Sequence, residues 1–263
     1  MILLDWKVLS DGFTEAPEAI VIHGGSWRRK VRFQATAFLL LHPTHGPILV
    51  DTGYSQRFHE ETQRFPGRFY RWATKVTLTH PTGIKGILEN LGIKASDIRH
   101  LILTHFHGDH VGGLRDFPDA QVHCSNAAWE YTRKLRGFSA VRHGVLPGLI
   151  PEDFATRLHF VAEGSDVLGD GSLHVLALPG HAVGQIGLRF NGVQAQPVLL
   201  AADACWLSES FRKNLLPHGL TRLLHDWDDY RNSLQRLHDL HRSEPSLLIV
   251  PSHCPEIASR IVS

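Results

Sequence analysis

The stretch Thr104-His105-Phe106-His107-Gly108-Asp109-His110 places three histidines and an aspartate within a few positions of one another. Imidazole nitrogens and carboxylate oxygens are the ligands that zinc and similar divalent metals prefer. Residues two apart on an extended segment point the same way, so His105 and His107 can hold one metal. A turn after Gly108 then brings Asp109 and His110 toward a second position, about 3.5–4 Å away in typical two-metal sites. The stretch therefore predicts a metal site, in preference to histidines that merely cap the start of a helix.

Two metals need more ligands than this stretch supplies, and three candidates occur later in the chain. His181, Asp203 and His253 each follow directly after an apolar run that predicts a strand. Loops at strand ends gather at one edge of a sheet, where sites are usually built. A carboxylate has two oxygens, so Asp203 could bridge two cations. We therefore expect these side chains to converge on the histidine-rich stretch.

Short apolar runs recur along most of the chain, separated by Gly, Pro and Asp residues, and predict strands. The expected strands are Phe33–Leu41, Pro47–Val50, Arg99–Leu103, Gln121–Cys124, Leu158–Ala162, Ser172–Leu178, Ile186–Phe190, Pro197–Ala201 and Leu247–Val250. Apolar residues at helical spacing predict the helices Gly83–Leu91 and Asp226–His241, and an Asn suited to N-capping predicts a third helix over Asn126–Leu135. Gly169-Asp170-Gly171 predicts a hairpin turn. Strands followed by helices favour sheets covered by helices over a helical bundle.

The chain has 263 residues, which suits one large α/β domain or two small ones. We expect a single domain over residues 1–263. The segments 54–80 and 137–155 show little periodicity and many aromatic, Arg, Gly and Pro residues. They are predicted to be loop or lid insertions near the site, with ordinary surface connections as the alternative. An apolar face near them is a candidate contact for a homodimer.

The charge, the cysteines and the apolar runs of the chain limit its partners and its compartment. Lys plus Arg total 27 and Asp plus Glu total 26, which leaves no basic footprint for nucleic acid. The three cysteines form no C-x-x-C pair, a usage that suits a reducing compartment. No apolar run is long enough to span a bilayer, and no signal peptide is evident. We therefore expect a cytoplasmic protein that acts on a small molecule, with neither a nucleic-acid nor a membrane partner.

Taken together, the motifs resemble those of the metallo-β-lactamase superfamily. The resemblance lies in Val50-Asp51-Thr52-Gly53, Thr-His-x-His-x-Asp-His-x-Gly-Gly at 104–113, Gly-His at 180–181, Asp203 and His253. It covers the chain from about Phe33 to His253. It implies an α/β fold of the αββα type: two mixed sheets packed face to face, helices on the outer faces, and a dinuclear site along their shared edge.

The resemblance also implies a role for each residue. It assigns His105, His107 and His181 to the first metal, Asp109, His110 and His253 to the second, and Asp203 to a bridge between them. Asp51 would support the metal loop from behind the ligands. The implied cofactors are two divalent ions, zinc first, with iron or manganese as alternatives.

Two such metals lower the pKa of a shared water toward neutrality and so supply a hydroxide nucleophile. Asp109 could orient that nucleophile and shuttle its proton. Within the family the pattern is most similar to N-acyl-homoserine lactonases and related small-ester or organophosphate hydrolases. We therefore expect a metal-dependent lactonase or esterase. Phosphotriester or phosphodiester hydrolysis on the same site is one alternative, and a non-catalytic metal-binding sensor or accessory protein is another.

One position departs from the lactonase pattern. Those enzymes place a tyrosine three residues after the bridging aspartate, where this chain has Trp206. An indole N–H can donate a hydrogen bond but cannot accept one or ionise. We expect Trp206 to line the pocket and count it, with Asp109 and Asp203, among the catalytic candidates. The alternative is a core aromatic residue at the start of the next helix.

Overall fold

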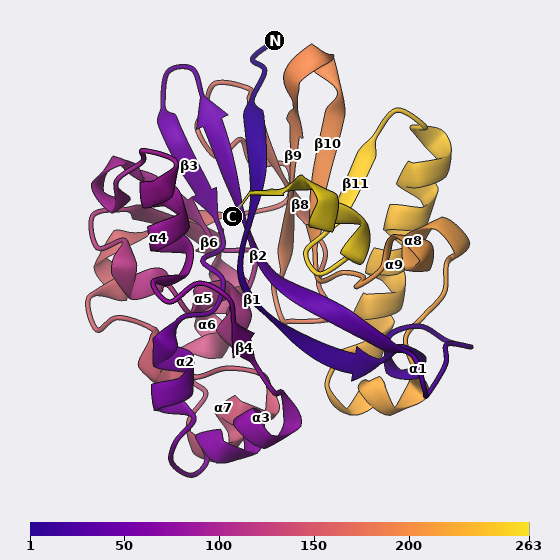
Figure 1. Ribbon diagram of the computed structural model, residues 1–263. Helices are drawn as coiled ribbons and strands as arrows, with labels where there is room; N and C mark the ends of the chain where they lie inside the picture. The colour runs from indigo at the N-terminus through magenta and orange to yellow at the C-terminus, as the bar shows by residue number, and fades with distance from the viewer. Residues whose placement is uncertain (263) are drawn as a thin grey trace.

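Two β-sheets pack face to face, and helices cover the outer face of each (Figure 1). The structure is a computed structural model that describes residues 1–262. The larger sheet has eight strands and the smaller has four. Both sheets contain parallel and antiparallel neighbours, so the expected αββα sandwich of mixed sheets is confirmed.

The larger sheet follows the order β12-β1-β2-β3-β5-β6-β7, and β4 pairs with β1 outside this path. Its strands are β1 (Asp5–Pro17), β2 (Lys30–His42), β3 (Gly46–Val50), β4 (Thr77–Leu78), β5 (His100–Ile102), β6 (Gln121–Ser125), β7 (Leu158–Val161) and β12 (Ile261–Val262). The strands β3, β5, β6 and β7 are parallel neighbours. The carboxyl ends of these strands therefore meet at one edge of the sheet.

The smaller sheet follows the order β11-β10-β9-β8. Its strands are β8 (Leu173–Ala177), β9 (Ile186–Asn191), β10 (Pro197–Ala202) and β11 (Leu248–Pro251). The strands β8, β9 and β10 are antiparallel, and β11 lies parallel to β10. The loops after β10 and β11 consequently leave the sheet at the same edge.

The helices lie mostly outside the sheets (Figure 1). The α-helices are α1 (Glu18–Val21), α2 (Gln56–Glu61), α3 (Gly67–Ala73), α4 (Gly83–Asn90), α5 (Gly108–Val111), α6 (Asn126–Thr132), α7 (Gly137–Arg142), α8 (Ser208–Lys213) and α9 (Trp227–Ser243). The short 3-10 helices are η1 (Ala95–Asp97), η2 (Leu114–Asp116), η3 (Pro147–Leu149), η4 (Phe154–Arg157), η5 (Val193–Ala195), η6 (Gly219–Leu223) and η7 (Pro255–Arg260). Of the helices in residues 1–262, none combines the length and apolar character that crossing a membrane requires.

The central strands are buried on both faces, which explains their nearly continuous apolar sequences. In β2, Phe38 and Leu40 pack in the core between the two sheets. Ala37 and Leu39 point the other way, into the core beneath the helices. Residues two apart share a face of a strand, so one apolar run supplies both layers.

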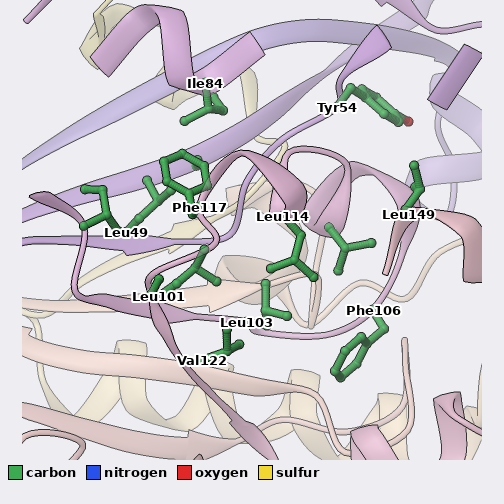
Figure 2. Packing of buried hydrophobic residues seen from close by; sticks show 14 of the residues in the cluster. Leu49, Tyr54, Ile84, Leu101, Leu103, Phe106, Leu114, Phe117, Val122 and Leu149 are labelled. Carbon is green, nitrogen blue, oxygen red and sulfur yellow. The ribbon is translucent and has the colours of Figure 1, made fainter. Parts of the chain in front are cut away.

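The helix-side core of the larger sheet lies directly behind the histidine-rich stretch Thr104–His110, the predicted metal-binding stretch (Figure 2). Leu101 and Leu103 pack in this core with Ile84 of α4 and with Phe106 from the stretch itself. Because Phe106 is buried here, its neighbours His105 and His107 are carried on a rigid support. The fold thus fixes the position of the first two expected ligands.

All nine expected strands and all three expected helices form, with ends displaced by at most three residues. The long strand β1 was not expected. Its sequence lacks clean alternation because it contains a register shift between Ser10 and Gly12, with the buried Asp11 at the irregular position. The tertiary pairing with β2, rather than local pattern, determines this strand.

The turn at Gly169–Gly171 forms, and both glycines adopt positive φ values of 77° and 80°. It does not join neighbouring strands of one sheet, because β7 and β8 lie in different sheets. Its two arms run antiparallel: they share a bridge between Asp166 and His174, and backbone hydrogen bonds join Val167 to Leu173 and Val175 to Ser165. The expected hairpin turn therefore forms, and it also lies on the connection from the larger sheet to the smaller one.

The segment 54–80 carries α2, α3 and β4, and the segment 137–155 carries α7 and η3. The two segments meet where Phe69 of α3 contacts Phe138 of α7, with ring centroids 5.7 Å apart. In Figure 1, α3 and α7 lie together at the lower end of the molecule. These two helices were not expected, because each is short and neither begins at a side-chain cap.

Candidate metal centre

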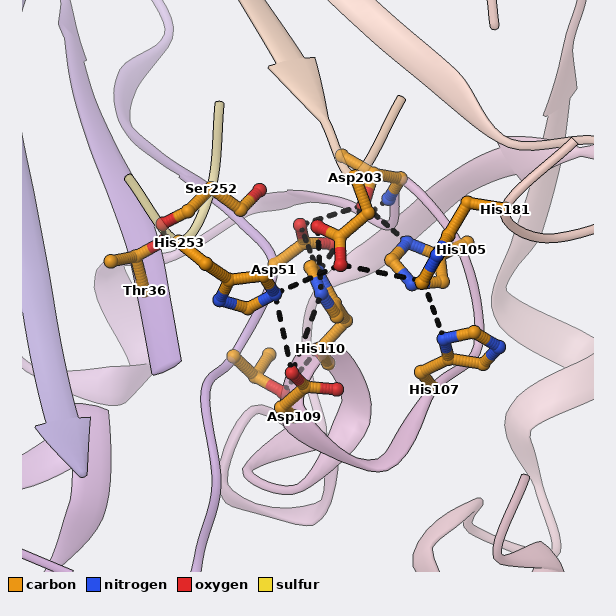
Figure 3. A network of polar contacts seen from close by, with 12 residues as sticks. Thr36, Asp51, His105, His107, Asp109, His110, His181, Asp203, Ser252 and His253 are labelled. Atoms are coloured by element: carbon orange, nitrogen blue, oxygen red, sulfur yellow. Dashed lines mark hydrogen bonds and ion pairs between the residues drawn. The ribbon is translucent and has the colours of Figure 1, made fainter. Parts of the chain in front are cut away.

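All seven expected ligand side chains lie together at one edge of the sandwich (Figure 3). The histidine-rich stretch follows β5 of the larger sheet. His181, Asp203 and His253 follow β8, β10 and β11 of the smaller sheet. Both sheets therefore contribute to one cluster, which forms where their loops meet.

The ligand atoms fall into overlapping groups of three. Those of His105, His107 and His181 all lie within 4.8 Å of one another, and so do those of Asp109, His110 and His253. A third group contains Asp203 with His105 and His110, one residue from each of the other two groups.

The carboxylate of Asp203 contacts side chains of both outer groups. Its Oδ2 lies 2.9 Å from Nε2 of His253 and 3.3 Å from Nε2 of His181. Its Oδ1 lies 3.4 Å from Nε2 of His110. Asp203 thus occupies the position between the two groups that a bridging carboxylate requires.

Several polar atoms of the cluster have no hydrogen-bond partner within residues 1–262. They are Nε2 of His105, Nε2 of His110, Nδ1 of His181 and Oδ1 of Asp203, all of them buried. Buried polar atoms are nearly always paired, and an unpaired one costs about 1–3 kcal/mol. Five imidazoles and two carboxylates with such unpaired atoms fit a pair of divalent cations such as zinc.

Burial also keeps most of these imidazoles neutral, which is the form that binds a metal. It lowers the pKa of His105 and His181 well below the usual value, and that of His107 to about 4. At His110 burial acts in the same direction, but three nearby aspartates outweigh it and raise the pKa. The two sides of the cluster therefore differ in their electrostatic surroundings.

Asp51 holds the metal-binding stretch from behind. One oxygen accepts a hydrogen bond from the backbone N–H of Thr104, at 2.9 Å. The other accepts from the Thr104 hydroxyl and from Nδ1–H of His110, both at 2.8 Å. The bond to Nδ1 leaves Nε2 of His110 as the nitrogen that faces the cluster, since a carboxylate partner fixes tautomer and ring orientation.

His253 is fixed in the same manner by the other sheet. Its Nδ1–H donates to the backbone carbonyl of Gln34 in β2, at 2.6 Å. The Thr36 hydroxyl donates to the carbonyl of Ser252, also at 2.6 Å. The last ligand of the smaller sheet is therefore tied to a strand of the larger one (Figure 3).

The Gly-Gly pair that ends the motif allows two loops to touch. A Cβ on Gly112 would lie 2.6 Å from the carbonyl oxygen of Gly53, and one on Gly113 would lie 2.7 Å from that of Thr52. The backbone N–H of Gly112 donates to that same Gly53 carbonyl, at 3.0 Å. Only glycine allows the Asp51 loop to approach the metal-binding stretch this closely.

A cavity of about 490 Å³ opens beside the cluster and is largely apolar. Trp206 forms part of its wall, with its ring centroid 5.8 Å from that of His181 and 5.7 Å from that of Phe33. It lies ahead of α8 (Ser208–Lys213) rather than inside that helix. The structure thus brings Trp206 to the cavity, together with Asp109 and Asp203.

Sequence reasoning missed other residues of this region. Tyr54 and Tyr70 line the same cavity. His225 and Arg142 line both this cavity and a second one of about 360 Å³, which lies beside His107 and His181. The position of Tyr54, directly after the Asp51 loop, was an available signal, whereas Tyr70 and His225 belong to no motif.

A separate group of His42, His45 and Asp170 also has the residue types of a metal site. Nδ1 of His42 accepts hydrogen bonds from the backbone N–H groups of Thr44 and His45, at 3.2 and 3.1 Å. The proton of the neutral ring is therefore on Nε2, which lies 3.0 Å from a carboxylate oxygen of Asp170. This nitrogen has no lone pair to offer a metal, so the group is better explained as a hydrogen-bonded turn.

Comparison with known proteins agrees with this geometry. The model of the metallo-beta-lactamase superfamily matches residues 31–253. A "probable metallo-hydrolase" of Mycobacterium tuberculosis is 30% identical, with 83% of this chain and 74% of that protein covered. An N-acyl homoserine lactonase of Bacillus thuringiensis subsp. kurstaki is 27% identical, with 80% and 77% covered.

Solved structures share the fold. An N-acyl homoserine lactone hydrolase with N-hexanoyl-L-homoserine at its catalytic metal centre matches with a TM-score of 0.76 and 22% identity, covering 98% of this chain and 96% of that one. AidC, a dizinc quorum-quenching lactonase, matches with a TM-score of 0.69 and 17% identity, covering 96% and 88%.

The contact between Gly112 and Gly53 yields a first prediction. Gly112→Ala forces the two loops apart, so we expect a loss of about 1–3 kcal/mol in unfolding free energy and a reduced metal content. Urea denaturation and elemental analysis of the purified protein measure both. Gly219→Ala is the matched control, because its Cβ would meet nothing within 4 Å. Equal stability and metal content in the two variants would contradict the role given to this contact.

Proposed function

The chain belongs to the metallo-beta-lactamase superfamily of hydrolases, and from this premise we propose that it hydrolyses a small lactone or ester at a centre of two divalent metal ions. The observation that carries the proposal is the convergence of two groups of three ligands on Asp203, which contacts both. The relatives named N-acyl homoserine lactonases support a substrate of the N-acyl-homoserine lactone kind.

We assign His105, His107 and His181 to one metal and Asp109, His110 and His253 to the other, with Asp203 as the bridge. The donor set favours zinc, and a solved neighbour is described as a dizinc lactonase. When bound, the pair of metals would lower the pKa of a shared water and polarise the carbonyl group under attack.

Asp109 is the ligand best placed to move a proton. Its side chain is 17% exposed, against 3% for Asp203, and it lines the apolar cavity. Its Oδ2 lies 3.4 Å from Nε2 of His253 and 3.9 Å from Nε2 of His110. We propose that Oδ1, which takes no part in these contacts, accepts the proton of the attacking water and returns it to the leaving alkoxide.

The cavity favours a substrate with an apolar group. Its volume of about 490 Å³ lies within the range of small-molecule sites, and aromatic side chains including Phe33, Phe69 and Phe138 line it. Such a wall would hold an acyl chain, while the indole N–H of Trp206 could donate to the substrate carbonyl. The apolar lining favours an acylated lactone over a small charged phosphodiester.

The bridge assignment gives a second prediction. Asp203→Ala removes the carboxylate that contacts both ligand groups, so we expect loss of at least one metal per chain and a rate below about one hundredth of that of the unaltered protein. Elemental analysis and hydrolysis of acyl-homoserine lactones, aryl esters and phosphotriesters are the measurements. Asp119→Ala, at an exposed turn, serves as the control. Full metal content and activity in Asp203→Ala would refute the bridge. If the unaltered protein holds metal but hydrolyses none of these substrates, the result favours a metal-binding sensor.

The position of Trp206 gives a third prediction. Trp206→Tyr introduces a hydroxyl beside His181, so kcat/KM for lactones should change by a larger factor than kcat/KM for phosphotriesters. Trp27→Tyr, at an exposed position, controls for the loss of an indole. Equal changes for both substrate classes would count against a contact between Trp206 and the lactone.

A further inference from the structure

Four aromatic side chains form an exposed cluster on α3, α7 and the turn before α3. Phe65, Phe69, Trp72 and Phe138 are 73%, 48%, 80% and 56% exposed. The ring of Phe69 lies 5.8 Å from that of Phe65 and 5.7 Å from that of Phe138, so these three rings are contiguous. Trp72 follows Phe69 by three residues in α3, on the same side of the helix. Contiguous apolar patches of this kind on a protein surface mark an interaction site more often than scattered single residues do.

The same region carries concentrated positive charge. Residues 62–88 and 131–151 contain no Asp or Glu, although the whole chain has a net charge of only +1. Arg64, Arg68, Arg71 and Lys75 are all exposed, and none forms an ion pair within residues 1–262. We call these four cations and the four aromatic residues above the basic aromatic face.

The basic aromatic face adjoins the candidate active site. Phe69, Trp72 and Phe138 belong both to the exposed cluster and to the wall of the 490 Å³ cavity that reaches Asp109 and Asp203. Side chains that are exposed and also line a cavity form its rim. Whatever docks on this face therefore covers the entrance through which a substrate reaches the metal cluster.

We propose that the basic aromatic face docks on an anionic lipid membrane. Exposed Trp and Phe beside unpaired Arg and Lys is the combination that binds the interface of acidic bilayers, where aromatic rings enter the headgroup region and cations attract anionic lipids. A second copy of this chain is a poor occupant, because a two-fold contact would oppose the same cations to each other. The sequence predicts no membrane partner because none of its apolar runs is long enough to span a bilayer. The contact proposed here is peripheral and requires no membrane-spanning segment.

Docking would place the cavity entrance against the bilayer. If the substrate carries an acyl chain, as in the proposed function, it concentrates in the membrane and could enter the apolar cavity directly from the lipid. Only this consequence rests on the proposed function. Membrane binding itself follows from the surface and is measured without any substrate, so the two proposals can fail separately.

The test is co-sedimentation of the full-length, metal-loaded protein with phosphatidylglycerol–phosphatidylcholine vesicles and with pure phosphatidylcholine vesicles. We expect binding to the anionic vesicles that weakens in high salt, since surface charges are screened. The double variant Arg64→Glu/Arg68→Glu should bind the anionic vesicles about tenfold or more weakly. Neither residue lines the cavity, so hydrolysis of a soluble substrate should be unchanged.

A matched double variant, Arg99→Glu/Arg242→Glu, reverses two exposed cations on other parts of the surface. Arg99 precedes β5 at the end opposite the metal-binding stretch, and Arg242 lies in the last turn of α9, about 22 Å from its start. This control should bind vesicles like the unaltered protein. Phe65→Ser, which removes an exposed ring without changing charge, should weaken binding as well.

Three results would overturn the proposal. The first is equal binding of the unaltered protein to anionic and neutral vesicles, and the second is equal binding of the two charge-reversed variants to anionic vesicles. The third is a concentration-dependent dimer in sedimentation velocity that Phe65→Ser abolishes, without vesicle binding, since that would assign the face to a second copy of the chain.

Discussion

The carboxylate of Asp51 is the interaction on which the candidate site depends. It accepts three hydrogen bonds from Thr104 and His110, and so fixes both the path of the metal-binding stretch and the orientation of one ligand. Asp51 itself has a φ of 60°, a conformation that costs a non-glycine residue roughly 1–2 kcal/mol. Such strain persists only where surrounding contacts determine it, as the buried hydrogen bonds of Asp51 do here.

The sandwich turns this local arrangement into a site shared by two sheets. The larger sheet supplies the stretch that Asp51 holds, and the smaller one supplies His181, Asp203 and His253. The bond from His253 to the Gln34 carbonyl crosses between the sheets, so the geometry of the site depends on how they pack. The core between the sheets, which includes Phe38 and Leu40, therefore supports function as well as stability.

The sequence specified the parts of this protein whose signal is local. Apolar runs located the central strands, and the spacing of His105, His107, Asp109 and His110 located the cluster. The strand β1 could not be predicted, because the register shift near Asp11 interrupts its alternation and only pairing with β2 determines the strand. The helices α3 and α7 were also missed, since each is short and neither begins at a residue whose side chain caps it, unlike α6. The cavity they enclose arises from tertiary contacts that no short pattern records.

The central claim is that two metal ions share one carboxylate at the seam between the sheets. Anomalous scattering from crystals of the purified protein, measured at the absorption edge of the bound metal, tests this most directly. The account predicts two peaks about 3.5–4 Å apart, one beside His105, His107 and His181 and the other beside Asp109, His110 and His253, with Asp203 touching both. A single peak, or peaks away from these residues, would contradict it.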